Sequence, residues 1–174
     1  MEEAGLAFRV VPARFDERSV HAEPHRLVEE LACDKARAVA AQAKPGEPVV
    51  GSDTVVVLDG RVLGKPADAE DARATLRALS GRTHEVMTGV CVLVDGAARS
   101  FVETTRVSFY DLTDEEIAAY VASGEPMDKA GSNGIQDRGR LLVRGIEGDY
   151  YAVVGLPIAR LVRLLREMGL AQGA

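Results

Sequence analysis

Lysine, cysteine and long apolar runs are all scarce in this sequence. No run of apolar residues approaches the roughly 20 that a membrane-spanning helix needs, so we expect no membrane partner. The two cysteines, Cys33 and Cys91, do not have the spacing of metal ligands, and we expect both to be reduced thiols in the core. Together these features predict a cytoplasmic protein.

Excess positive charge is also lacking. The net charge is −6, with 21 basic against 27 acidic residues, which is not the footprint of a nucleic-acid-binding protein. We therefore expect no nucleic-acid partner. Since the chain has 174 residues and neither a repeat nor an obvious linker, we expect residues 1–174 to form a single domain.

The few lysines stand out against seventeen arginines. Where arginine is the usual cation, a lysine indicates a place that needs a compact ammonium group. An anionic substrate of so acidic a chain would need a local cluster of cations or a divalent metal. The four lysines are Lys35, Lys44, Lys65 and Lys129.

A buried strand is predicted from Val49 to Leu58, bounded by Pro48 and by a turn at Asp59-Gly60. Asp53 lies in the middle of this apolar run. An unpaired buried carboxylate is costly, so Asp53 needs a cation, several donors or a place beside a cleft. The alternative is a structural aspartate that caps a turn after Gly51.

Lys35 and Lys65 are expected to approach this strand. A helix is predicted from Pro24 to Ala43, and Lys35 falls within its apolar stripe. Its ammonium group either extends to the surface or points into a cleft toward an anion. The Asp59-Gly60 hairpin returns Lys65 toward Asp53. The expected pairs are Val57 with Val62, Val56 with Leu63, and Thr54 with Lys65.

The remaining pattern mixes strands with helices and predicts an α/β fold with a mixed, elongated sheet flanked by helices. Further strands are expected at Leu6–Val11, Thr83–Val94, Ala97–Phe109, Leu141–Ile146 and Tyr150–Val154. Further helices are expected at Asp68–Leu79, Thr113–Ser123 and Pro157–Met168.

Residues 126–140 form an irregular stretch that carries Lys129 and Gln136 between several glycines. Glycines allow the backbone to approach a ligand closely. The alternative is an ordinary loop exposed to solvent.

The motifs of several enzyme classes are absent: a Walker-type phosphate loop, a dinucleotide fingerprint and a Gly-x-Ser-x-Gly elbow. What remains is an aspartate with lysines. Such a set suits phosphoryl chemistry, because the carboxylate binds a metal or orients water and the ammonium groups neutralise phosphate charge. Spacing alone does not say which phosphate bond would be attacked.

A set of short segments runs along nearly the whole chain. They are Leu-Ala-Cys-Asp-Lys-Ala (31–36), Gly-Ser-Asp-Thr-Val-Val (51–56), Gly-Lys-Pro (64–66), Leu-Ser-Gly-Arg-Thr-His (79–84), Thr-Gly-Val (88–90), Gly-Glu-Pro-Met-Asp-Lys-Ala-Gly (124–131), Gly-Ile-Gln (134–136), Ile-Glu-Gly-Asp-Tyr-Tyr (146–151) and Val-Val-Gly-Leu-Pro (153–157). In these segments and in their order, the chain resembles the Maf family of nucleoside triphosphate pyrophosphatases.

The resemblance implies hydrolysis of a nucleoside triphosphate to the monophosphate and pyrophosphate, with Mg²⁺ or Mn²⁺ as cofactor. It also implies a preference for dTTP, UTP and related pyrimidine triphosphates, a two-lobed fold similar to that of inosine triphosphate pyrophosphatases, and a homodimer. The implied catalytic residues are Asp53, as proton acceptor, with Lys35 and Lys65. The implied substrate-binding residues are Thr54, Gln136, Glu17 and Lys129, and the implied metal ligands are Asp53 and Glu17.

Two departures from the family pattern bear on these expectations. Family members begin with a short strand and a Ser-x-Ser-Pro-Arg-Arg motif, which leads into the first helix. This sequence begins at the end of that helix, so we expect either a start codon placed too late or a truncated form of low activity. Asn133 stands where an aromatic residue commonly precedes Gly-Ile-Gln. The alternative function is a non-enzymatic regulator of septum formation and cell division.

Overall fold

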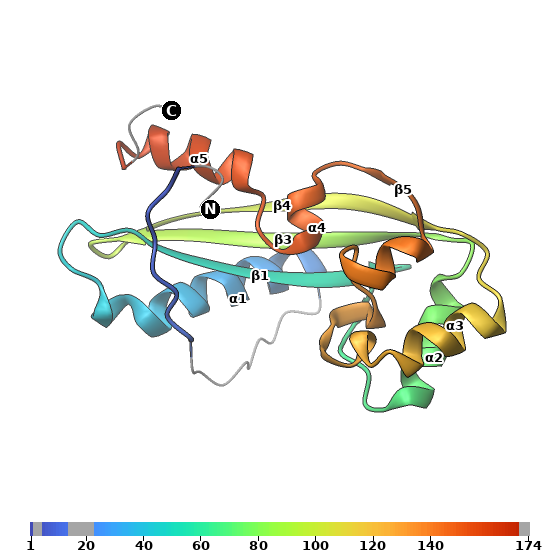
Figure 1. Ribbon diagram of the computed structural model, residues 1–174. Coiled ribbons are helices and arrows are strands. Elements are labelled where there is room, and N and C mark those ends of the chain that lie inside the picture. The colour runs from blue at the N-terminus through green and yellow to red at the C-terminus, as the bar shows by residue number, and fades with distance from the viewer. Residues whose placement is uncertain (2–4, 14–22, 171–174) are drawn as a thin grey trace.

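A computed structural model describes Met1, residues 5–13 and residues 23–170 (Figure 1). The helices are α1 (Pro24–Val39), α2 (Ala69–Leu79), α3 (Asp114–Ala122), α4 (Tyr150–Val154) and α5 (Ile158–Glu167). The strands are β1 (Val49–Leu58), β2 (Arg61–Leu63), β3 (Thr83–Val94), β4 (Ala97–Phe109) and β5 (Val143–Glu147). Short 3₁₀ turns are η2 (Ala40–Gln42), η3 (Glu125–Asp128), η4 (Ala130–Ser132) and η5 (Asp137–Leu142).

The strands form one sheet in the order β2-β1-β3-β4-β5. Helices flank it, which confirms the predicted α/β class (Figure 1). The prediction of a mixed sheet is wrong for the described strands, because all four neighbouring pairs are antiparallel. A parallel pair needs a long crossover, whereas β1 and β2, and β3 and β4, are joined by two-residue turns that reverse the chain.

The two hairpin turns fix the register of the sheet. Asp59 and Asp95 have positive φ, and each is followed by a glycine with positive φ, as a tight hairpin turn requires. The predicted pairs Val56 with Leu63 and Val57 with Val62 are confirmed. The predicted pair of Thr54 with Lys65 is not formed, because β2 ends at Leu63. Pro66 and the flexible Gly64 do not extend the ladder.

Helices α1 and α5 cover opposite faces of the sheet (Figure 1). Val28 of α1 packs on Val55 and Val57 of β1. On the other face, a cluster of buried side chains joins α5 to β3. Its members are Leu161, Leu164, Leu165, Val90 and Val92.

Helix α1 lies unusually close to the sheet because two glycines face its backbone. A Cβ atom on Gly51 would collide with the carbonyl oxygen of Ala32, and one on Gly89 would collide with the carbonyl oxygen of Val28. Backbone therefore rests on backbone at both points, which brings α1 within reach of polar groups on β1.

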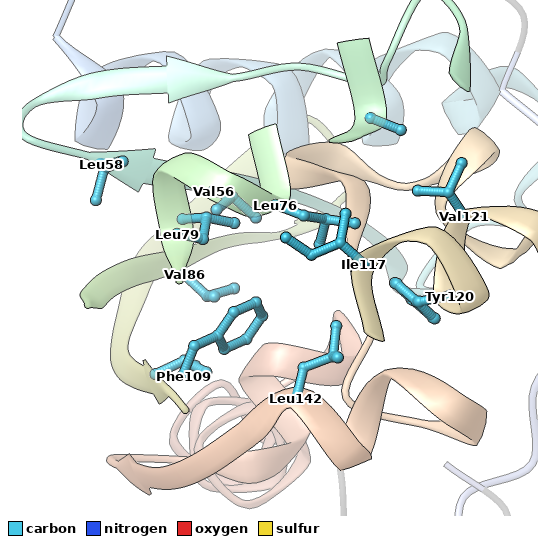
Figure 2. Packing of buried hydrophobic residues seen from close by; sticks show 12 residues of the cluster. Val56, Leu58, Leu76, Leu79, Val86, Phe109, Ile117, Tyr120, Val121 and Leu142 are labelled. Carbon is cyan, nitrogen blue, oxygen red and sulfur yellow. The ribbon is translucent and has the colours of Figure 1, made fainter. Parts of the chain in front are cut away.

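A further cluster lies between α2, α3 and one end of the sheet. Figure 2 shows its central side chains, which come from three different elements: Leu76 and Leu79 from α2, Ile117 from α3, and Phe109 from β4. A capping box formed by Thr113 and Glu116 begins α3. The two ends of the sheet thus carry separate apolar clusters.

Two predicted strands are not strands. Residues Leu6–Val11 have no strand structure, and Arg9 attaches this segment through its side chain, which donates to Glu47 and to the carbonyl of Gln42. Tyr150–Val154 forms α4 because Asp149 caps it and accepts a hydrogen bond from the Tyr151 amide. None of the helices in the described part of the chain has the length and apolar character needed to cross a membrane.

Candidate functional site

The centre of the candidate site is an ion pair between Lys35 on α1 and Asp53 on β1. Asp53, Val55 and Val57 alternate along β1, so their side chains share the face that α1 covers. Lys35 follows buried Leu31 and Ala32 by about one helical turn and therefore projects toward the sheet. Of the two alternatives for Lys35, the structure thus has the ammonium directed at an anion.

This pair is only partly shielded from water. The Lys35 side chain is 28% exposed and the Asp53 side chain 14% exposed. Strand β2 covers the outer edge of β1 only from Val56 to Leu58. Among the described residues no strand pairs with the outer edge of β1 beside Asp53, so β1 is an edge strand at this point.

Lys65 lies just beyond the end of β2 and is exposed. The carbonyl of Gly64 accepts a hydrogen bond of 3.0 Å from the amide of Gly131, which joins this segment to the 126–140 stretch. The pKa of Asp128 is lowered mainly by a hydrogen bond from Lys129, and the charge of Lys65 contributes less. The proximity of Lys65 to Asp53 stays a prediction.

Lys129 and Gln136 occupy different environments within the irregular stretch. The Lys129 ammonium donates to the carbonyl of Glu125 at 2.9 Å and to the Asp128 carboxylate at 2.7 Å. The stem of Lys129 lies against Gly134, where a Cβ atom would meet it at about 2.9 Å. Gln136 is exposed. The stretch forms three 3₁₀ turns rather than a plain loop.

The loop between η4 and Gln136 is held by buried contacts. Gly131 and Ser132 both have positive φ, and both are buried. The amide of Gly134 donates to the hydroxyl of Tyr120 at 3.3 Å, and burial raises the pKa of that hydroxyl to about 12. Asn133, which departs from the family pattern, donates from its side chain to the carbonyl of Gly131 at 2.8 Å. The loop that presents Gln136 therefore has a defined backbone path.

Thr54 lies on the opposite face of β1 from Asp53 and joins a chain of hydroxyl groups. Its Oγ1 is 2.8 Å from Oγ1 of Thr88, which donates at 2.7 Å to the carbonyl of Ala152 in α4. Ser52, on the same face, donates to the carbonyl of Gly155 at 2.7 Å and contacts that of Gly89 at 3.0 Å. Ser52 thus contacts the segment between α4 and α5 directly, and Thr54 is linked to α4 through Thr88.

Ser52 and Thr88 were missed from the sequence as site residues. Their partners lie 103 and 64 residues away along the chain, so no local pattern indicates the contacts. The available signal was that Thr88 falls within the Thr-Gly-Val segment (88–90), where a hydroxyl group interrupts an apolar strand.

The metal assignment reaches beyond the described residues, because Glu17 lies outside them. Within residues 5–13 and 23–170, no group of three or more His, Cys, Asp or Glu side chains could hold a metal ion. Asp53 supplies a single carboxylate. That donor set still fits Mg²⁺, which proteins bind through one or two carboxylates together with water and substrate phosphates.

Known proteins resemble this chain along nearly its whole length. The family model described as "Maf-like protein" matches residues 1–168. A "dTTP/UTP pyrophosphatase" of Koribacter versatilis (strain Ellin345) is 51% identical over 170 residues, which cover 97% of this chain and 88% of the relative. A protein of the same name from Bacillus cereus (strain AH820) is 46% identical over 171 residues, covering 98% of this chain and 89% of the relative.

Proposed function

Since the chain belongs to the Maf family, we propose that it hydrolyses nucleoside triphosphates to the monophosphate and pyrophosphate. The proposed substrates are dTTP, UTP and related or modified pyrimidine triphosphates, following the name of the relatives. Removing such nucleotides would be a house-cleaning activity. The observation that carries the proposal is the partly buried ion pair of Lys35 with Asp53, on a part of β1 whose outer edge pairs with no described strand.

In the proposed reaction, a water molecule attacks the α-phosphorus of the substrate. The Asp53 carboxylate accepts a proton from this water as the new oxygen–phosphorus bond forms. The bond between the α-phosphorus and the oxygen that bridges to the β-phosphate breaks, and its electron pair leaves with pyrophosphate. The nucleoside monophosphate remains as the second product.

The lysines provide the positive charge that this reaction needs. Lys35 holds the Asp53 carboxylate in position and is close enough to face a phosphate bound beside it. Lys65 follows the end of β2 and is exposed, and its ammonium group is the proposed partner of the β- and γ-phosphates. Positive groups fixed before the reaction stabilise charge that develops on the phosphate oxygens. Thr54, Gln136 and Lys129 are the proposed contacts to the rest of the nucleotide.

Asp53 and Glu17 are the proposed ligands of a divalent cation, Mg²⁺ or Mn²⁺. Held by these residues, the cation would neutralise negative charge on the triphosphate. The curated relatives have the name of an enzyme, so the alternative of a non-enzymatic regulator is not favoured.

The proposal is tested by measuring pyrophosphate release from a panel of triphosphates in the presence of Mg²⁺ or Mn²⁺. We expect release from dTTP and UTP. Substituting Asp53→Asn removes the proton acceptor with little change in shape, and we expect kcat to fall by about 100-fold or more. Release of orthophosphate instead of pyrophosphate would mean that a different phosphate bond is cleaved.

A matched control is available on the helix that carries Lys35. Asp34 forms an exposed ion pair with Arg37 at 3.0 Å, so Asp34→Asn makes the same change of charge away from the site. We expect this variant to keep the activity of the unmodified chain. Equal activity of Asp53→Asn and Asp34→Asn, with both variants folded by circular dichroism, would exclude the proposed role of Asp53.

A further inference from the structure

The hydrogen bonds of Thr54 and Thr88 determine which of the two hydroxyl groups donates to the other. The two residues lie directly opposite each other on β1 and β3. Thr88 donates its hydroxyl proton to the carbonyl of Ala152, because a carbonyl oxygen can only accept. A hydroxyl group has one proton to donate. The proton between the two threonine oxygens, which are 2.8 Å apart, therefore belongs to Thr54.

The orientation is fixed because Thr88 is fully buried. Its exposed fraction is 0%, so no water can replace the carbonyl of Ala152 as acceptor of its proton. Turning the Thr88 proton toward Thr54 would break a buried hydrogen bond of 2.7 Å. Thr54 is a partly buried residue, and its hydroxyl group has already used its own proton. Toward any ligand, then, Thr54 offers lone pairs only.

This arrangement distinguishes the pyrimidine bases. Uracil and thymine present an N–H donor at ring position 3, whereas cytosine presents a lone pair there. An oxygen that can only accept forms a hydrogen bond with the N3–H group of uracil or thymine, but it repels the N3 lone pair of cytosine. A site that requires a particular hydrogen bond discriminates strongly against an analogue that leaves its polar group unpaired.

We propose that Thr88 sets the choice of base: by donating to Ala152, it makes Thr54 a hydrogen-bond acceptor that selects uracil and thymine over cytosine. This inference rests on the proposed function. Thr88 does not touch the substrate in this scheme and acts as a positioning residue. The junction of α4 and α5 borders the Thr54 hydroxyl, since a Cβ on Gly155 would lie 3.7 Å from it.

The test is the ratio of kcat/KM for UTP to that for CTP, with Mg²⁺ present. Thr88→Val keeps the shape of the side chain but removes the donor to Ala152. The Thr54 proton has then lost its acceptor and can turn toward N3 of cytosine. We expect the UTP-to-CTP ratio to fall by about tenfold or more. Thr88→Ser retains the hydroxyl and should restore the ratio.

Ser52→Ala is the matched control. Ser52 attaches the same α4–α5 junction to β1 through the carbonyl of Gly155, yet it does not contact Thr54 through a hydrogen bond in the described structure. Ser52→Ala should therefore leave the UTP-to-CTP ratio unchanged. An equal fall of the ratio in Ser52→Ala and Thr88→Val would mean that loosening of the junction causes the change, and would overturn the inference.

A measurement on the unmodified chain covers the case in which Thr88→Val does not fold. The triphosphate of 3-deazauridine has a C–H group in place of the N3–H donor of uridine. We expect its kcat/KM to be about tenfold or more below that of UTP. Equal values would overturn the inference.

The two proposals fail in different ways. If the unmodified chain releases pyrophosphate from UTP but Thr88→Val keeps its UTP-to-CTP ratio, only the role of Thr88 is wrong. If the unmodified chain releases no pyrophosphate from any triphosphate, the proposed function is wrong, and the inference that rests on it is overturned as well.

Discussion

Lys35 and Asp53 form an ion pair across the interface between α1 and β1, 18 residues apart in the sequence. The pair is partly buried, with the aspartate more shielded than the lysine. Its position depends on the close packing of α1 against Gly51, which lies two residues before Asp53 on the same face of β1. The geometry of the candidate site is thus coupled to the stability of one helix–sheet contact.

Removing the ammonium group of Lys35 should lower both the stability of the chain and its activity. Lys35→Met keeps much of the length of the side chain but deletes one partner of Asp53. We expect the free energy of unfolding to fall by about 1–2 kcal/mol, as for a partly exposed ion pair, and kcat/KM to fall by roughly 100-fold. Urea unfolding and a pyrophosphate-release assay measure the two effects.

The double variant Lys35→Met with Asp53→Asn separates pairing from general damage. If the two side chains act through each other, their effects on unfolding should not add. Strict additivity in the double-mutant cycle would contradict a direct interaction between Lys35 and Asp53.

The close approach of α1 predicts a large effect of a single methyl group. Gly51→Ala places a Cβ against the backbone of Ala32 and Ala36, which cannot give way as a flexible side chain could. We expect a loss of about 1–3 kcal/mol in stability and a larger relative loss of activity, because α1 carries Lys35. Gly64→Ala is the control, since no atom lies within 4 Å of its added Cβ. Equal stability of the two variants would show that α1 can move away without cost.

His84 should make stability depend on pH. Its ring is buried, packs edge-on against Phe109 at 4.9 Å, and has no hydrogen-bond partner for either nitrogen within the described structure. Burial lowers the pKa of His84 to about 4 from an ordinary value of 6.5. Above pH 6.5 the ring is neutral in both states. Between pH 6.5 and about 4 only the unfolded state takes up the proton, so stability is lost as the pH falls.

The loss due to His84 should reach at most about 3 kcal/mol. Urea unfolding at pH 7.5 and pH 5 measures it, with His84→Phe as the comparison. The phenylalanine variant retains an aromatic ring next to Phe109 and cannot be protonated. We expect it to lose less stability than the unmodified chain on acidification. The same pH dependence in both proteins would assign the effect to other groups.

Cys91 should be nearly inert while Cys33 reacts. Both cysteines are free, as predicted, and Cys91 is only 1% exposed. Burial, with a smaller effect of the hydrogen bond to Cys33, raises the pKa of the Cys91 thiol to about 12. Only the thiolate is a good nucleophile. Mass spectrometry after brief treatment with iodoacetamide at pH 8 should find Cys33 modified first, and Cys91 modified only after unfolding.

The order of modification has a simple control. Cys33→Ser should leave almost no reactive thiol in the folded chain and one in the unfolded chain. Rapid labelling of Cys91 in the folded Cys33→Ser variant would mean that the core around β3 opens readily.

Much of the sheet could be predicted from the sequence because its signals are local. The bounds of β1, β3 and β4 were predicted to the residue, since apolar runs end at Asp-Gly turns that also set the register. The sequence left open whether Lys35 extends to the surface or points toward an anion, and the structure pairs it with Asp53. The predicted pair of Thr54 with Lys65 was wrong because β2 ends at Leu63.

The failures concern segments whose structure depends on distant contacts. Tyr150–Val154 has the aromatic and β-branched residues typical of a strand, yet it folds as α4. Asp149 caps it, and Thr105 of β4 anchors Asp149 by two hydrogen bonds. The Asp149 amide donates to the Thr105 hydroxyl at 3.0 Å, and that hydroxyl donates to the Asp149 carbonyl at 3.1 Å. The aspartate was visible in the sequence, but its attachment to a strand 44 residues earlier was not.

Backbone-on-backbone packing at Gly51 and Gly89 limits how far the position of Lys35 can adjust. Side-chain contacts can be rearranged by rotamer changes, but the carbonyl groups of Ala32 and Val28 have no such freedom. The spacing between helix and sheet is therefore set by the rigid peptide units themselves. Lys35 belongs to a helix whose distance from the sheet is fixed, and its ammonium group can reach only as far as its own four methylene groups allow.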